Sequence, residues 1–84
     1  NSDKATRVIV IRMRSVPAID ASAMKSLREL ADRAKKKKIT LVFSHVNEQP
    51  MSVMVKDGFT EYVGAQNFHA NIVEALDYAE NLVK

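Results

Sequence analysis

The 84-residue sequence contains no cysteine, which excludes a disulfide scaffold and any zinc site built on cysteine. Long hydrophobic runs are also missing: the longest, residues 8–11 and 39–43, are far shorter than the roughly 18 residues of a membrane-spanning helix. The two glycines, Gly58 and Gly64, form no glycine-rich element that could cradle a phosphate. What is present is an ordinary apolar fraction of 46%, which excludes a disordered chain. These features predict one small soluble domain over residues 1–84.

The first residue, Asn1, is neither Met nor part of a hydrophobic targeting stretch. Such a start is typical of a piece of a longer protein, and the absence of cysteine suits the cytosol.

Charge is distributed unevenly along the chain. Residues 1–42 carry eleven Lys and Arg against four Asp and Glu, whereas residues 43–84 carry two against six. This asymmetry could steer the domain toward an anionic lipid layer, a nucleic acid or an acidic partner. It is also typical of a soluble protein whose faces differ without any such partner, and this interpretation is favoured.

Strand and helix patterns alternate. Residues 7–13 and 39–44 are nearly continuous apolar runs, which are typical of strands covered on both faces. The remaining predictions are helices over residues 20–37, 48–57 and 71–83, and a short third strand or extended segment over residues 59–63. The order β-α-β-α-β-α predicts an α/β fold with parallel strands. A sheet of so few strands protects its edges poorly. We therefore expect additional strands, either from residues ahead of Asn1 or from a partner.

Catalytic and metal-binding patterns are not evident. His45 and His69 have no metal-ligand spacing, and Ser44 and His45 point to opposite faces of a strand. We therefore expect no enzyme activity, no metal and no cofactor.

The basic run Lys35–Lys38 ends the first predicted helix. These cations could bind phosphates of lipid or nucleic acid, but they also offset the negative end of the helix dipole. No aromatic residue interleaves the run, so base stacking is unsupported, and no nucleic-acid partner is predicted. The dipole interpretation is favoured.

The start of that helix is the most informative segment. Asp20 fits an N-cap, and Ser22 then lies in the exposed first turn near unpaired backbone N–H groups. A phosphoryl group on Ser22 would be stabilised there by the helix dipole. The alternative is that Ser22 is an ordinary polar residue of a first turn.

The segment Asp20-Ala21-Ser22-Ala23 resembles the signature of STAS domains, named for sulphate transporters and anti-sigma-factor antagonists. The resemblance continues through residues 39–46, 49–58 and 59–64 to a final helix with the Ala75-Leu76 pair, as in the SulP anion-transporter branch. Two departures stand out: Ala23 replaces the usual Gly, and the family's N-terminal strands and first helix have no counterpart. The chain would then be about the C-terminal two-thirds of one STAS domain.

The resemblance implies a cytoplasmic regulatory domain of a SulP-type sulphate or anion transporter, on the inner face of the membrane. It implies contacts with the transporter's membrane domain or a cytosolic regulatory protein, and it allows a homodimer. The residues implied in partner contact are Asp20, Ala21, Ser22, Ala23 and Lys25, with Ser22 the candidate for phosphorylation. The alternative is a free-standing anti-sigma-factor antagonist switched by phosphorylation of Ser22.

Overall fold

The computed structural model describes residues 7–83, in which strands and helices alternate as expected. The elements are β1 (Val8–Arg12), α1 (Ala21–Lys36), β2 (Thr40–Ser44), α2 (Glu48–Asp57), α3 (Phe59–Val63), the 3-10 turn η2 (Ala65–Asn67), β3 (Phe68–His69) and α4 (Ile72–Leu82). The α/β fold class is confirmed, and so are three predicted helices, which become α1, α2 and α4. None of the helices within residues 7–83 has the length and apolar character needed to cross a membrane.

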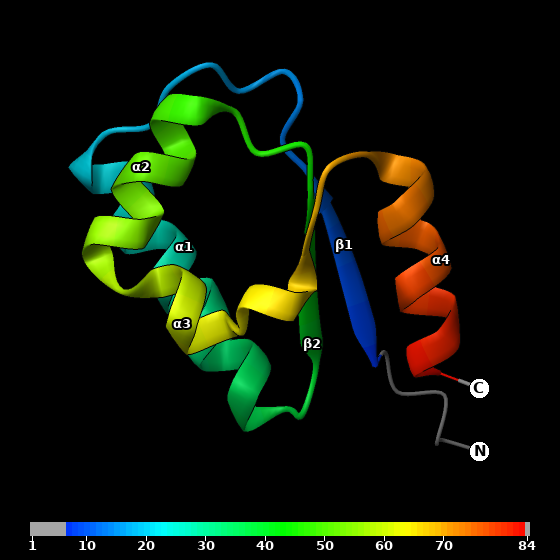
Figure 1. Cartoon of the computed structure of the whole chain (residues 1–84). Coiled ribbons are helices and arrows are strands. Elements are labelled where there is room, and N and C mark those ends of the chain that lie inside the picture. The colour runs from blue at the N-terminus through cyan, green and yellow to red at the C-terminus, as the bar shows by residue number, and fades with distance from the viewer. Residues whose placement is uncertain (1–6, 84) are drawn as a thin grey trace.

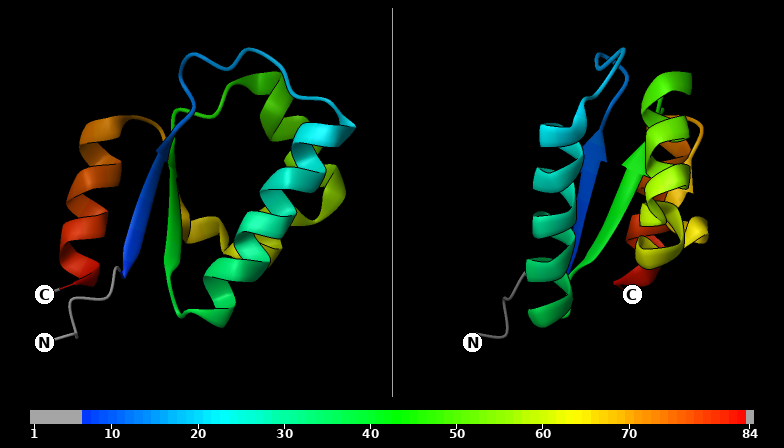
Figure 2. Two further views of the ribbon diagram at one scale, coloured as in Figure 1. Left: turned by 180° about the vertical axis from the view of Figure 1, so that it is seen from behind. Right: turned by 90° about the vertical axis from the view of Figure 1, so that its left-hand side faces the viewer.

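Three parallel strands form a sheet in the order β1-β2-β3. Val10 of β1 pairs with Val42 of β2, and Phe43 of β2 pairs with Phe68 of β3. Helices α1, α2 and α3 lie on one side of the sheet and α4 lies on the other (Figures 1 and 2). Because the strands run the same way, their carboxyl ends share one edge, and α1, α2 and α4 all begin near it.

Phe43 is the centre of the core between the sheet and α1–α3. Its ring stacks on Phe68 with centroids 4.9 Å apart and meets Phe59 edge-on at 5.7 Å. Met54 of α2 is also fully buried in this cluster. On the other side of the sheet, α4 buries Ala75 and Ala79, whose small side chains allow the helix to approach the strands closely.

The sequence predicts a short third strand or extended segment over residues 59–63, and that prediction is wrong: these residues form α3. Gly58, at φ 82°, ends α2 in the left-handed conformation and the chain enters another helical turn at once. The turn brings Phe59, Tyr62 and Val63, spaced i, i+3 and i+4, onto the face that packs on the core. The third strand lies further along, at Phe68–His69.

β1 also differs from the expectation of a strand covered on both faces. Val8, Val10 and Ile11 are only partly buried and Ile9 is 37% exposed, whereas residues 41–44 of β2 are all buried. The reason is position: within the described residues β1 pairs with β2 alone and is an edge strand. An apolar composition suited to the middle of a sheet therefore lies at its margin.

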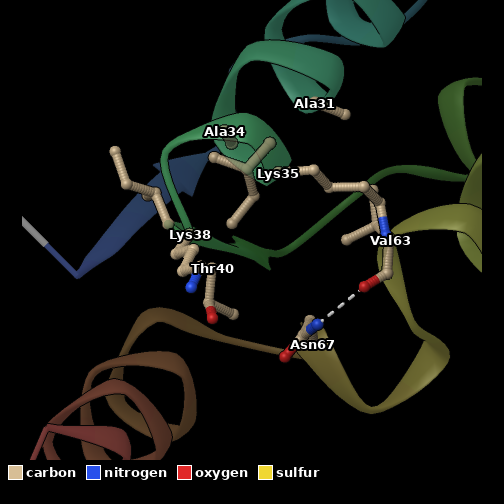
Figure 3. Close-up of a pocket in the computed structure, with 9 residues that line it drawn as sticks. Ala31, Ala34, Lys35, Lys38, Thr40, Val63 and Asn67 are labelled. Atoms are coloured by element: carbon tan, nitrogen blue, oxygen red, sulfur yellow. Dashed lines mark hydrogen bonds between the residues drawn. The ribbon is translucent and has the colours of Figure 1, made fainter.

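A pocket of about 300 Å³ opens beside the last turn of α1 and the start of β2 (Figure 3). It lies at the amino end of β2, away from the sheet edge where the helices begin.

Candidate interaction site

The start of α1 has the local structure that the sequence predicts. Asp20 is the N-cap, with extended backbone angles of φ −108° and ψ −175°. Its Oδ1 accepts a hydrogen bond from the backbone N–H of Ala23 at 2.8 Å. This bond satisfies one of the N–H groups that a helix leaves without an internal partner, so the position at which α1 begins is determined locally.

The other residues of the predicted site lie around this cap. Ala21, Ser22 and Lys25 are exposed, whereas Ala23 is partly buried. Ser22 is the second residue of α1, at the positive end of the helix dipole. The segment is therefore accessible from solvent, and added negative charge at Ser22 would be favourable to its own helix.

Asn47, the residue before α2, holds the loop between β1 and α1. Its Nδ2 donates to the carbonyl oxygens of Val16 at 2.9 Å and Arg14 at 3.0 Å, with a longer contact to Met13 at 3.4 Å. One side chain thus connects to several carbonyls of a loop more than 30 residues earlier in the chain.

Gln49 continues this connection to the end of the loop. Its Oε1 accepts from the N–H of Ile19 at 2.8 Å, and its Nε2 donates to the carbonyl oxygen of the same residue at 3.2 Å. The Gln49 amide thus pairs with both backbone polar groups of Ile19, as a neighbouring strand would in a sheet, and it positions Ile19 immediately before the Asp20 cap. Sequence reasoning missed Asn47 and Gln49 because only the fold brings the start of α2 to this loop.

A groove of about 650 Å³ separates α1 from α2 next to the exposed start of α1. Its lining combines an apolar base with charged side chains of both signs. The lining residues are Ala21, Met24, Lys25, Arg28, Glu29, Asp32, Val53, Lys56 and Asp57. A groove of this kind can accept the side chains of a docking protein without any catalytic group.

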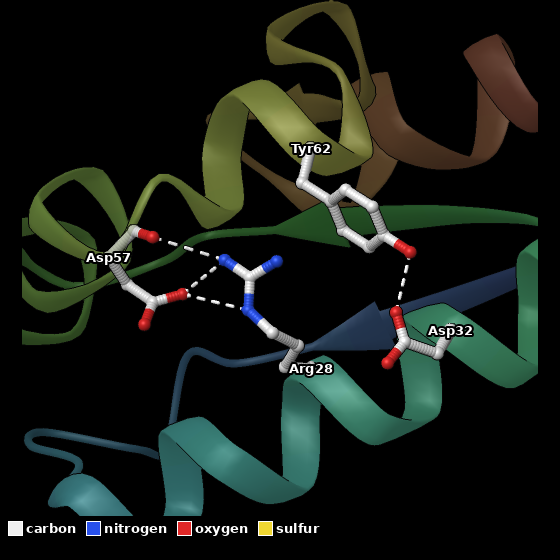
Figure 4. Close-up of polar contacts among 4 residues, drawn as sticks. All are labelled: Arg28, Asp32, Asp57 and Tyr62. Atoms are coloured by element: carbon white, nitrogen blue, oxygen red, sulfur yellow. Dashed lines mark hydrogen bonds and ion pairs between the residues drawn. The ribbon is translucent and has the colours of Figure 1, made fainter.

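Arg28, which lines the groove from α1, binds Asp57 at the end of α2 (Figure 4). Its Nε lies 3.1 Å from Oδ2 of Asp57, its Nη2 donates to the Asp57 carbonyl oxygen at 3.1 Å, and Nη2 also pairs with Oδ2. The guanidinium therefore binds both the side chain and the backbone of one residue, a geometry that lysine could not reproduce.

Tyr62 of α3 makes the second polar connection to α1 (Figure 4). Its hydroxyl donates to Oδ1 of Asp32 at 2.5 Å. Two cations lie over its ring: Cζ of Arg28 is 4.9 Å and Nζ of Lys35 is 4.4 Å from the ring centroid. The hydrogen bond to the Asp32 carboxylate raises the pKa of Tyr62 above its usual value of 10.0, and the neighbouring Arg28 opposes this only in part. Together with the Arg28–Asp57 pair, this contact holds α1 to α2 and α3.

His45, His69 and Ser44 lie in different environments. His45 is exposed and His69 is partly buried against the ring of Tyr78, while Ser44 is buried. The backbone N–H of His45 donates to the carbonyl oxygen of His69 at 2.9 Å, so the two residues are neighbours at the end of the sheet. Within residues 7–83, no three His, Cys, Asp or Glu side chains are grouped closely enough to hold a metal ion.

The family model described as "STAS domain" matches residues 2–75 of this chain. Over 75 residues the chain is 25% identical to the probable sulfate transporter 4.2 of Arabidopsis thaliana, covering 89% of this chain and 11% of the transporter. The chain thus spans about a ninth of that relative's length.

Two solved structures share the fold over 92% of this chain. One is a sulfate transporter family protein from Wolinella succinogenes, with a TM-score of 0.87 and 35% identity, of which the chain covers 63%. The other is the STAS domain of a SulP transporter from Vibrio cholerae, with a TM-score of 0.85 and 26% identity, of which the chain covers 60%.

Proposed function

This chain belongs to the STAS domain family, and from that premise we propose that it is the cytoplasmic regulatory domain of a SulP-type sulphate or anion transporter. In this role it acts by protein contact. It carries no anion itself and catalyses no reaction.

The relatives support the transporter branch. The matched curated protein is named a sulfate transporter, and the two matched structures are a sulfate transporter family protein and a SulP transporter domain. The alternative, a free-standing anti-sigma-factor antagonist, is not favoured by these relatives. Since the chain corresponds to only 11% of the matched transporter, transport itself belongs to the remainder of such a protein.

The observation that carries the proposal is the exposed, well-positioned start of α1. Ser22 and Lys25 are open to solvent beside the groove between α1 and α2, while Asn47 and Gln49 hold the preceding loop. A docking surface that is already ordered loses little conformational entropy on binding. We propose that Asp20, Ala21, Ser22, Ala23 and Lys25 contact the transporter's membrane domain or a cytosolic regulator.

Ser22 is the proposed point of regulation within this surface. A phosphoryl group would bring a charge of roughly −2 to the contact while remaining compatible with the helix start. Its effect would therefore fall on the partner and not on folding.

Sulfate uptake by the full-length protein containing this chain tests the proposal. Ser22→Asp and Lys25→Glu should each change the uptake rate by about fivefold or more, the lower end of usual allosteric coupling. The matched control is Ser52→Asp, which makes the same change at an exposed position on α2. Equal amounts of each variant in the membrane must be verified by immunoblotting.

Uptake unchanged by both α1 variants would remove this surface from the proposed function. An equal change in the Ser52→Asp control would show a general charge effect and would contradict the proposal in the same way.

A further inference from the structure

The pocket at the amino end of β2 has the lining of a small ligand site. Its volume of about 300 Å³ is at the lower end of the roughly 300–1,000 Å³ typical of ligand pockets. Its wall is apolar and polar in about equal parts, and the two alanines of α1 leave it open. The apolar lining residues are Ala31, Ala34, Ile39, Leu41 and Val63.

Four polar side chains complete the wall, and two of them are cationic. Lys35 and Lys38 lie on opposite sides of the pocket, with Thr40 next to Lys38 and Asn67 below (Figure 3). No carboxylate is among the described residues that line it. A pocket with both apolar and polar lining and two lysines at its rim fits a ligand that is negatively charged and carries a compact apolar body.

Asn67 is a fixed part of this wall and not a surface residue. It is 5% exposed, its Nδ2 donates to the carbonyl oxygen of Val63 at 2.9 Å, and its Oδ1 accepts from the Tyr78 hydroxyl at 2.8 Å. The amide orientation is therefore set before any ligand arrives. Lys35 is also positioned, since its Nζ lies 4.4 Å from the centroid of the Tyr62 ring.

Lys38 occupies a backbone position where glycine is usual. Its φ is 60°, the left-handed conformation, and the following N–H of Ile39 donates back to the carbonyl oxygen of Ala34 at 2.8 Å. This arrangement ends α1, and the left-handed residue in such an ending is most often Gly because a side chain is strained there. The lysine at this strained position places its side chain at the pocket, where its charge can act on a ligand.

Compensation of the helix dipole alone does not account for the position of Lys35 and Lys38 at the pocket. Lys36 and Lys37 serve the end of α1 equally well, and neither lines the pocket. We therefore propose that Lys35 and Lys38 form a binding site for a small organic anion, a carboxylate or phosphate monoester with a compact apolar body. The site is separate from the start of α1 and does not depend on the proposed docking function.

Benzoate is a suitable probe, and benzamide is its uncharged counterpart of nearly the same shape. Titration of the ¹⁵N-labelled 84-residue chain with benzoate should give saturable amide shifts at Thr40, Val63 and Asn67. Benzamide and inorganic phosphate should each bind at least about tenfold more weakly, because one lacks the charge and the other the apolar body. Benzamide or phosphate binding as tightly as benzoate would overturn the proposal.

Two double variants of equal charge separate the pocket from the basic run as a whole. Lys35→Gln with Lys38→Gln should weaken benzoate binding at least about tenfold, whereas Lys36→Gln with Lys37→Gln should leave it within about twofold. Thermal unfolding and the amide spectrum establish that both are folded. Equal losses in the two variants, or no saturable shifts in the unsubstituted chain, would refute the site.

A third variant, Lys38→Gly, keeps the proposal testable if the double variant fails to fold. It relieves the left-handed position and should fold at least as well as the unsubstituted chain, yet it should bind benzoate more weakly. Undiminished benzoate binding by this variant would remove Lys38 from the site and overturn the two-lysine proposal.

Discussion

The side-chain amide of Asn47 donates to the backbone carbonyl of Val16 at 2.9 Å, across 31 residues of sequence. Through this contact the start of α2 determines the conformation of the loop that leads into α1. The interaction surface proposed for α1 is therefore supported by a different element of the fold.

Replacement of Asn47 should show how much the loop depends on this support. Asn47→Ala leaves the partly buried Val16 carbonyl without its donor, and we expect a loss of about 1–3 kcal/mol in the free energy of unfolding. Urea unfolding measures this loss of free energy. The control is Asn81→Ala, where an exposed Asn bonds only within its own helix, and a change below about 0.5 kcal/mol is expected. Equal midpoints for the two variants would contradict the role assigned to Asn47.

The Asp20 cap gives a smaller and more local prediction. Asp20→Ala removes the acceptor for the Ala23 N–H and should cost about 0.5–2 kcal/mol of stability. Asp77→Ala, an exposed position within α4, is the control and should cost less than about 0.5 kcal/mol. Denaturant midpoints compare the two. An unchanged midpoint for Asp20→Ala would mean that α1 begins without help from this side chain.

Tyr62 should make stability depend on pH at the alkaline end. Its pKa is raised by the hydrogen bond to Asp32, so the folded state retains the phenol proton at a pH where the unfolded state has lost it. The stabilisation is complete below pH 10.0 and is lost as the pH rises through the folded pKa. Absorbance titration of the phenolate, with Tyr62→Phe to leave the Tyr78 signal alone, measures the shift.

Asp32→Asn is the matched test of the cause. It removes the carboxylate while keeping a similar shape, and the pKa of Tyr62 should return toward 10.0. A pKa that stays equally high in this variant would contradict the role of Asp32.

The left-handed conformation of Lys38 predicts a stabilising substitution. Lys38→Gly should raise the free energy of unfolding by about 0.5–1 kcal/mol, because glycine adopts this conformation without strain. Lys36→Gly, at the last residue of α1, should instead lower it by up to about 1 kcal/mol. The two variants lose the same charge, so opposite signs in thermal unfolding isolate the backbone effect. Destabilisation by both would show that Lys38 is not strained.

Features set by near neighbours in the sequence could be predicted. The cap at Asp20 depends on a side chain three residues from its backbone partner, and this prediction is confirmed. The cap at Asn71, whose Oδ1 accepts from the N–H of Glu74, and the left-handed Gly58 at the end of α2 are equally local features. Membership of the STAS family was also predictable, because the order of these local features is itself the family's pattern.

Features set by tertiary contacts were not predictable in the same way. Residues 59–63 contain Phe, Thr, Tyr and Val, which favour strands, but packing of Phe59 on Phe43 sixteen residues earlier selects a helix. The contacts from Asn47 and Gln49 join segments about 30 residues apart. The sequence favours dipole compensation by the whole run 35–38, and only the folded turn at Lys38 places Lys35 and Lys38 at one pocket and leaves Lys36 and Lys37 outside it.

The position of β1 has a practical consequence for handling the chain. Val8–Arg12 has the side chains of an interior strand, yet within the described residues it is bonded to a neighbour on one flank only. Backbone donors and acceptors on the other flank offer a template to any extended peptide, including a second molecule in a concentrated sample. Purified material should therefore be kept dilute, and its sedimentation should be measured over a range of concentrations before any binding curve is interpreted.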